Sequence, residues 1–124
     1  MSTIEIDKVK NTINIKLWLI HFKDENGIHF IHSPNLDITG YGLTKKEAKQ
    51  SFEIALEEFF DYAIKNKTLI KVLNDLGWET KEFENISVNH NIFSIIKNTE
   101  FVSEIFEKYP VNSFHEKIGI PVYA

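Results

Sequence analysis

The helix that begins near residue 45 constrains the fold more than any other feature of the sequence. Thr44 and Glu47 form a capping box, in which the threonine hydroxyl caps the first turn and the glutamate returns a hydrogen bond. Apolar residues then recur at intervals of three and four over a helix predicted at 45–65: Ala48, Phe52, Ala55, Leu56, Phe59 and Ala63. We expect this apolar stripe to cover one face of a β-sheet.

Extended segments before the helix predict that sheet. Isoleucine and leucine alternate with polar residues in a strand predicted at 13–23, as is typical of a half-buried strand. Asn26-Gly27 predicts a hairpin turn, because both residues tolerate a positive φ. Further strands are predicted at 28–33 and 38–43, with an edge strand at 3–8. These segments predict an α+β fold, an antiparallel β-meander packed on a long capped helix.

The hairpin fits a two-residue or a four-residue loop, and both loops place the same side chains on the same face of the sheet. The predicted core face holds Ile13, Ile15, Leu17, Leu19, His21, Ile28, Phe30 and His32. The other face is mixed. Trp18, Phe22, His29 and Tyr41 would form an aromatic surface for a protein partner if that face is open, whereas C-terminal helices that pack there would cover it.

A second, shorter helix is predicted after the long one. Thr68 is predicted to cap its start, and Gly77 is predicted to end it in the left-handed conformation. Trp78 then falls at the position that packs back on Leu73 in a Schellman motif.

The rest of the chain predicts a helical extension. Amphipathic helical segments are predicted at 92–97 and 99–109, and a terminal extended segment at 118–123. We therefore expect an α+β domain at 1–77 and, at 78–124, a helical C-terminal extension that packs on it and ends in a short strand.

The composition argues against several classes of function. Lysine supplies all 14 basic residues, against 18 acidic ones, for a net charge of −4. Phosphate neutralisation and base readout favour a basic, arginine-bearing protein, so we expect no direct nucleic-acid binding. The chain has no cysteine, which excludes disulfides and thiolate chemistry. Its apolar runs are too short for a signal peptide or a membrane span, so we expect a cytoplasmic protein.

No pattern predicts a catalytic centre, a cofactor or a metal site, and we expect a protein that is not an enzyme. A metal-dependent nuclease needs converging carboxylates, but Asp24 and Asp37 fall in turns and the first long strand has no acid. His29 and His32 point to opposite faces of a strand. His21 and His32 are predicted to share a face and to meet across the hairpin.

A row of charged residues with i,i+4 spacing follows the solvent side of the long helix: Lys49, Glu53, Glu57, Asp61 and Lys65. One interpretation is a solvated face with ion pairs worth a few tenths of a kcal/mol each. The other is an acidic ridge of Glu53, Glu57 and Asp61 that steers a basic partner.

Two motifs resemble the HicB-like antitoxin family. Ser33-Pro34-Asn35-Leu36-Asp37 is similar to the family's proline-containing Pro-x-Leu turn. Gly42-Leu43-Thr44-Lys45-Lys46-Glu47-Ala48 is similar to the Gly-x-Thr-x-x-Glu-Ala start of its long helix. The order of strands, turn and capped helix also matches, and the resemblance covers about residues 13–63.

The resemblance implies a partial ribonuclease H-like fold without a catalytic role and a small, basic, RNA-cleaving toxin of the HicA type as partner. Many members add a C-terminal DNA-binding domain, whereas this sequence reaches Ala124 where those helices should begin, so we expect no DNA binding. We expect a protein-interaction module that binds such a toxin-like protein or self-associates, as a homodimer or higher homo-oligomer, through an edge strand. The alternative is a small metal-dependent nuclease or hydrolase on a ribonuclease H-like scaffold.

Overall fold

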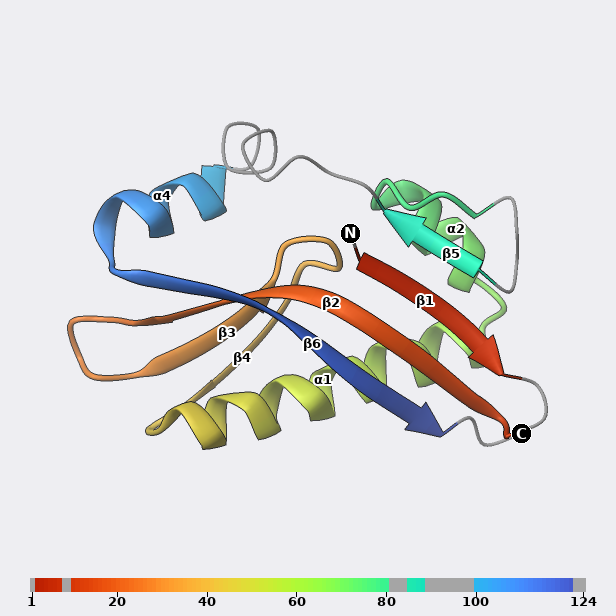
Figure 1. Cartoon of the computed structure of the whole chain (residues 1–124), viewed down its shortest axis with the longest axis horizontal. Helices are drawn as coiled ribbons and strands as arrows, with labels where there is room; N and C mark the ends of the chain where they lie inside the picture. Colours follow the sequence, from red (N-terminus) through yellow and green to blue (C-terminus); the bar gives the residue numbers. More distant parts are fainter. Residues whose placement is uncertain (1, 8–9, 81–84, 89–99, 122–124) are drawn as a thin grey trace.

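The computed structural model describes residues 2–7, 10–80, 85–88 and 100–121 (Figure 1). Within them, one antiparallel sheet is built from six strands: β1 (Ser2–Asp7), β2 (Thr12–Lys23), β3 (His29–Ser33), β4 (Ile38–Gly42), β5 (Asn85–Val88) and β6 (Val111–Pro121). The helices are α1 (Lys45–Lys65), α2 (Leu69–Asp75) and α4 (Glu100–Lys108). The predicted α+β fold, with the long helix packed on an antiparallel sheet, is confirmed.

Strand β2 lies at the centre of the sheet and pairs with three other strands. β6 pairs with it over the whole stretch from Thr12 to Phe22. β1 pairs with residues 12–16, and β3 pairs with residues 20–23. A strand has only two hydrogen-bonding edges, so β1 and β3 follow each other along the edge that β6 leaves free. β5 continues the sheet beyond β1 and β4 beyond β3, which divides it into two branches (Figure 1).

Buried polar groups join the two branches at the middle of β2. The Trp18 backbone N–H donates to Ser2 Oγ at 3.1 Å, and the Ser2 hydroxyl donates to Asn35 Oδ1 at 2.8 Å. Trp78 Nε1 donates to the carbonyl oxygen of Asn35 at 2.9 Å. All four residues are buried. A buried N–H without an acceptor costs about 1–3 kcal/mol, so the Ser2 side chain supplies what neither neighbouring strand provides at this point.

Two apolar clusters lie on opposite faces of β2. Its odd-numbered residues face α1 in the larger cluster: Ile13, Ile15, Leu17 and Leu19, packed with Phe52, Leu56 and Phe60. Its even-numbered residues Trp18, Ile20 and Phe22 form the smaller cluster with Val102 and Ile105 of α4. The central strand is therefore buried on both faces only where α4 covers the second one.

Helix α1 has the predicted bounds. Thr44 Oγ1 accepts a hydrogen bond from the Glu47 N–H at 3.1 Å, as in a capping box. The Glu47 carboxylate accepts instead from the N–H of Leu43, one residue before the cap, at 2.9 Å.

None of the helices that the structure describes is long and apolar enough to cross a membrane.

The helix approaches β4 closely through a glycine. A Cβ added at Gly40 would lie 2.6 Å from the carbonyl oxygen of Ala48 and closer still to the backbone of Phe52. The Gly40-Tyr41-Gly42 segment is therefore a contact surface for the α1 backbone, where a larger residue would push the helix away from the sheet.

The hairpin between β2 and β3 closes through a three-residue loop, not through the two-residue or four-residue loop predicted. Gly27 has φ 79°, its N–H donates to the Asp24 carbonyl at 3.1 Å, and the Asp24 N–H donates to the Ile28 carbonyl at 3.0 Å. Phe30 thus lies opposite Phe22. An odd loop length shifts the register by one residue and reverses the faces of β3.

The predicted assignment of β3 side chains to the two faces is consequently wrong. Ile31 lies opposite His21 on the face that packs on α1. Phe30 and His32, expected on that core face, lie on the α4 side with Phe22 and Ile20.

The short helix α2 ends as predicted. Gly77 has φ 92°, and the Trp78 N–H donates to the Leu73 carbonyl at 2.9 Å, which is the Schellman bond. The predicted cap at its start is wrong in one respect, because the Thr68 side chain makes no capping hydrogen bond.

The C-terminal part contributes more strand than predicted. The helix predicted at 99–109 is α4, and the one predicted at 92–97 lies outside the described residues. β6 has 11 residues and begins seven positions before the short strand predicted at 118–123. β5 was not predicted.

Replacing Gly40 by alanine should destabilise the fold by about 2–3 kcal/mol, because the added methyl group would force α1 away from β4. Gly119→Ala is a matched control, since the nearest atom to its added Cβ is Asn14 Oδ1 at 3.6 Å, an ordinary contact. Urea unfolding followed by tryptophan fluorescence measures both changes. Equal midpoints for the two variants would contradict the close approach.

Candidate binding surfaces

Trp18 and Phe22 of the predicted aromatic surface lie beneath α4. Their exposed fractions are 8% and 6%, and the ring of Phe22 stacks with that of Tyr109 at a centroid distance of 5.4 Å. The C-terminal helix therefore covers this part of the mixed face, as the alternative in the sequence analysis allowed. These two side chains serve the core that holds α4 in place.

Tyr41 and His29 do not join them in one surface. Tyr41 lies on the same face of the sheet but remains 66% exposed, with its ring 6.4 Å from that of Phe30. His29 lies on the opposite face, because the three-residue loop reverses β3. The four aromatic positions are thus divided among a core, an exposed edge and the α1 side.

His21 contacts His29. The prediction that His21 meets His32 is wrong, because the two lie on opposite faces of the sheet. His21 Nε2 and His29 Nδ1 are 2.9 Å apart, and the ring planes differ by 4°. The ring centroids are 5.2 Å apart, about the nitrogen–nitrogen distance plus two ring radii, so the rings lie edge to edge in line. This geometry is that of an N–H···N hydrogen bond between two imidazoles.

The surroundings of His21 indicate which nitrogen carries the proton. Burial, followed by the positive charge of Lys45 and the proximity of His29, lowers the pKa of His21. Its Nδ1 is buried and has no hydrogen-bond partner among the described residues. A buried N–H there would lack an acceptor, so we place the proton on Nε2, from which His21 donates to His29.

The histidine pair is spaced for a proton and not for a metal ion. Two imidazole nitrogens bound to one tetrahedral zinc ion lie about 3.3 Å apart, and each points at the metal and not at the other nitrogen. Among the described residues, no group of three or more histidine, aspartate or glutamate side chains is placed to hold a metal ion.

His32 is buried on the α4 side of the sheet. Its Nδ1 lies 2.8 Å from Thr39 Oγ1, and its ring forms a T-shaped contact with that of Phe101 at a centroid distance of 5.1 Å. Burial lowers the pKa of His32 to about 4, although Asp37 and a backbone hydrogen bond at Ile38 oppose the shift. His32 is therefore a neutral core residue at physiological pH.

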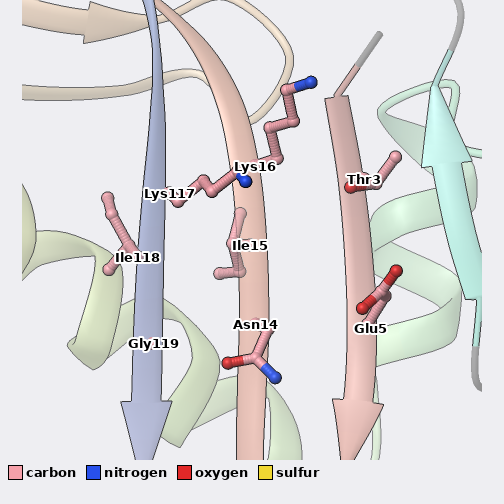
Figure 2. A pocket seen from close by; sticks show the side chains of 8 residues that line it. All are labelled: Thr3, Glu5, Asn14, Ile15, Lys16, Lys117, Ile118 and Gly119. Carbon is pink, nitrogen blue, oxygen red and sulfur yellow. The ribbon is translucent and has the colours of Figure 1, made fainter.

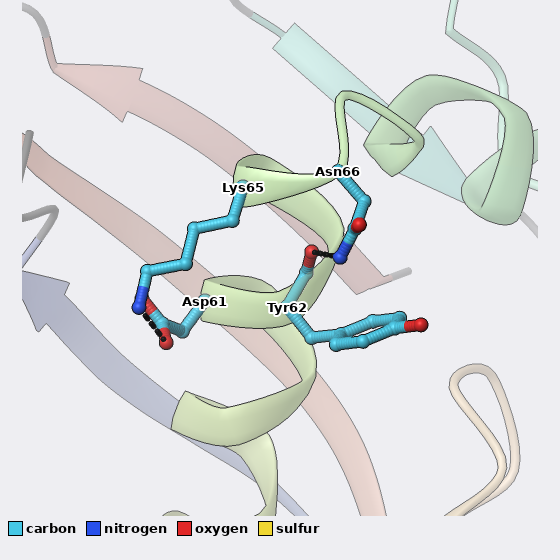
Figure 3. A network of polar contacts seen from close by, with 4 residues as sticks. All are labelled: Asp61, Tyr62, Lys65 and Asn66. Atoms are coloured by element: carbon cyan, nitrogen blue, oxygen red, sulfur yellow. Dashed lines mark hydrogen bonds and ion pairs between the residues drawn. The ribbon is translucent and has the colours of Figure 1, made fainter.

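The solvent side of α1 combines acids with exposed apolar side chains. We call this the α1 outer surface and define it by Glu53, Ile54, Glu57, Asp61 and Tyr62. Ile54 is 59% exposed and Tyr62 is 71% exposed. Figure 3 shows the Tyr62 ring extending away from the helix, while the carbonyl of Tyr62 accepts a hydrogen bond from Asn66 Nδ2 at 2.8 Å.

Three lysines of α1 have partners, two of them in β6 and one on the α1 outer surface itself. Lys49 forms an ion pair with Glu116 of β6, which raises the pKa of Lys49. Lys45 lies over the ring of Phe114, also in β6, at 5.1 Å from its centroid. Lys65 pairs with Asp61 at 3.0 Å (Figure 3). Glu57 has no ion-pair partner within the part of the chain that the structure describes, so the centre of the α1 outer surface keeps its negative charge.

The acidic row thus lies on the solvent side of α1, and the exposed side chains of Ile54 and Tyr62 beside it were not predicted. A usable signal was present, because both residues are apolar and fall outside the stripe that α1 buries. The acids considered for a nuclease lie apart from this surface: Asp24 Oδ1 accepts from the N–H groups of Asn26 and Ile28 in its own turn.

Comparison with protein-family models, curated proteins and solved structures finds no match to this chain. The resemblance to HicB-like antitoxins therefore rests on the sequence alone, that is, on the two motifs and on the order of the predicted elements.

The stability of the protein should depend on the protonation of His32. The unfolded chain binds this proton with a pKa near 6.5 and the folded protein near 4, so the free energy of unfolding falls as the pH is lowered through this window. The contribution is complete above about pH 7, and its loss near pH 4 is up to about 3 kcal/mol.

Urea unfolding between pH 7.5 and 4 is compared for the wild type and His32→Leu. The comparison separates the contribution of His32 to the free energy of unfolding from that of the carboxylates, which titrate in the same range. We expect the difference between the two proteins to change with pH in favour of the variant. A constant difference would show that His32 is not held neutral.

Proposed function

We propose that this chain is a non-catalytic protein-binding module of the HicB-like antitoxin type and that its partner is a small basic toxin-like protein. The observation that carries the proposal is the α1 outer surface, where Ile54 and Tyr62 are exposed on the same helix as the acidic row. Large exposed apolar side chains within a charged surface are typical of interfaces, in which buried aromatic residues supply much of the affinity.

The charge of this surface suits a basic partner. Glu53, Glu57 and Asp61 follow one side of the helix, and the net charge of the whole chain is −4. Complementary charges raise the rate of association and suppress wrong partners more than they add affinity. In this proposal the acids steer the partner, and Ile54 and Tyr62 anchor it.

The scaffold behind the surface supports the same interpretation. α1 has a side-chain cap at Thr44, approaches β4 through Gly40 and buries Phe52, Leu56 and Phe60 in the main core. A helix fixed in this way presents its outer side chains without loss of backbone entropy on binding. The alternative of a metal-dependent nuclease gains no support from the acids, since Asp24 and Asp37 belong to separate turns.

The proposal is tested first by searching the reading frames beside this chain for a small basic protein, and then by using that protein as the ligand. We expect a stable complex in size-exclusion chromatography with light scattering, which also reports whether the chain alone is a homodimer, and rescue of growth when the two proteins are co-expressed. Glu57→Lys and Tyr62→Ser should each weaken binding at least tenfold in calorimetry, because one reverses the central charge and the other removes an anchor.

Glu107→Lys on α4 is the matched control, because it makes the same change in charge at an exposed position on another helix. It should leave the affinity within about twofold of the wild type. Equal losses for Glu57→Lys and Glu107→Lys would reduce the effect to net charge and would overturn the role given to α1. Absence of any complex would overturn the proposed partner class.

A further inference from the structure

The face of the sheet that points away from α1 has an open polar hollow between β1, β2 and β6 (Figure 2). α4 covers this face only at its other end, over Trp18, Ile20 and Phe22. The hollow has a volume of about 440 Å³. Its polar lining comes from Thr3, Glu5, Asn14, Lys16 and Lys117.

The strand register places two lysines directly side by side in this hollow. Lys16 of β2 lies opposite Lys117 of β6 and, on its other edge, opposite Thr3 of β1. Figure 2 shows the Lys117 side chain extending from β6 over β2. Like charges in opposed positions destabilise a sheet, and neither lysine has an ion-pair partner among the described residues. This row therefore offers a hydroxyl and two ammonium groups to an anion.

The adjacent row has a different character. Glu5, Asn14 and Gly119 lie opposite one another across the same three strands. Glu5 supplies a hydrogen-bond acceptor, and Asn14 supplies both an acceptor and a donor. Gly119 has no side chain, and of the atoms that the structure describes only Asn14 Oδ1 lies within 4 Å of where one would begin, which leaves space for a ligand in this row. The second row thus suits hydroxyl groups next to the anion.

We propose that this hollow binds a small phosphorylated ligand that also bears hydroxyl groups, such as a sugar phosphate. Its phosphate lies against Lys16 and Lys117, with Thr3 as a further donor, and its hydroxyl groups bond to Glu5 and Asn14. Lysine binds phosphate as a point charge, and two lysines in adjacent strands hold one phosphate without the forked geometry that arginine gives.

A small ligand fits these observations better than a nucleic acid does. The volume falls within the usual range for small-molecule sites, about 300–1,000 Å³. Two lysines supply the positive charge of the residues that line the hollow, on a chain whose net charge is −4. A polynucleotide needs a continuous basic track, which repeated neutralisation of phosphates requires.

The test is a titration of the ¹⁵N-labelled full chain with ribose 5-phosphate and, separately, with inorganic phosphate, followed by heteronuclear NMR. Amide signals of residues 3–5, 14–17 and 116–119 should shift in both titrations, with at least threefold tighter binding of ribose 5-phosphate. Lys16→Gln and Lys117→Gln should each weaken binding about tenfold, because each removes a charged donor.

Two further variants separate the parts of the proposal. Glu5→Gln should reduce the preference for ribose 5-phosphate over inorganic phosphate while phosphate binding persists. Lys71→Gln, on α2, is the control because Lys71 pairs with Asp75 far along the chain from the hollow, and it should change nothing. The spectrum of each variant without ligand reports whether it is folded.

Several outcomes would overturn the proposal. Shifts that sodium chloride reproduces at the same ionic strength, or that survive both lysine substitutions, would show nonspecific screening. Equal affinity for the two ligands would remove the hydroxyl-binding part. Binding of a single-stranded RNA in the absence of any response to ribose 5-phosphate would make the hollow a polynucleotide site. The α1 outer surface lies on the other side of the sheet, so none of these results bears on the toxin-like partner.

Discussion

The pairing of β2 with β1, β3 and β6 is the constraint on which the rest of the structure depends. β6 occupies one edge of β2 along its length, and the other edge is divided between the two remaining strands. Where the division falls, the N–H of Trp18 donates to the Ser2 hydroxyl and not to a neighbouring strand. Both sheet branches, and the helices packed on them, take their positions from this strand.

The same arrangement separates the two candidate binding surfaces. Odd-numbered residues of β2 pack against α1, and the far side of α1 carries Glu57 and Tyr62. The even-numbered residues Asn14 and Lys16 line the polar hollow on the opposite face. A partner bound on the helix and a small ligand bound on the sheet would not touch each other. Any influence of one on the other would have to pass through the buried side chains of β2.

The parts of the fold that the sequence predicts well are those set by local chemistry. The bounds of α1 follow from Thr44, Glu47 and the apolar stripe, and the end of α2 follows from Gly77. The hairpin was also predicted, but its register was not. Asn26-Gly27 marks a turn equally well in two-, three- and four-residue loops, and only the pairing of Phe22 with Phe30 distinguishes them.

Contacts between distant segments escaped prediction for a related reason. The hollow joins residues near position 3 to residues near position 117, and no local pattern in either segment indicates the other. The acidic row of α1 was found because it obeys helical spacing within one element. The meeting of His21 with His29 was missed because a one-residue difference in loop length decides which side chains face each other.

The three-residue loop at Glu25, Asn26 and Gly27 also limits how this chain can evolve. Loss or gain of a single residue there would move the side chains of Phe30 and His32 to the face that packs on α1. It would move Ile31 to the face that α4 covers. Loops elsewhere on a protein surface tolerate such indels because no buried pattern depends on their length. Lineages that keep this architecture should therefore alter the length of the loop by even numbers of residues only.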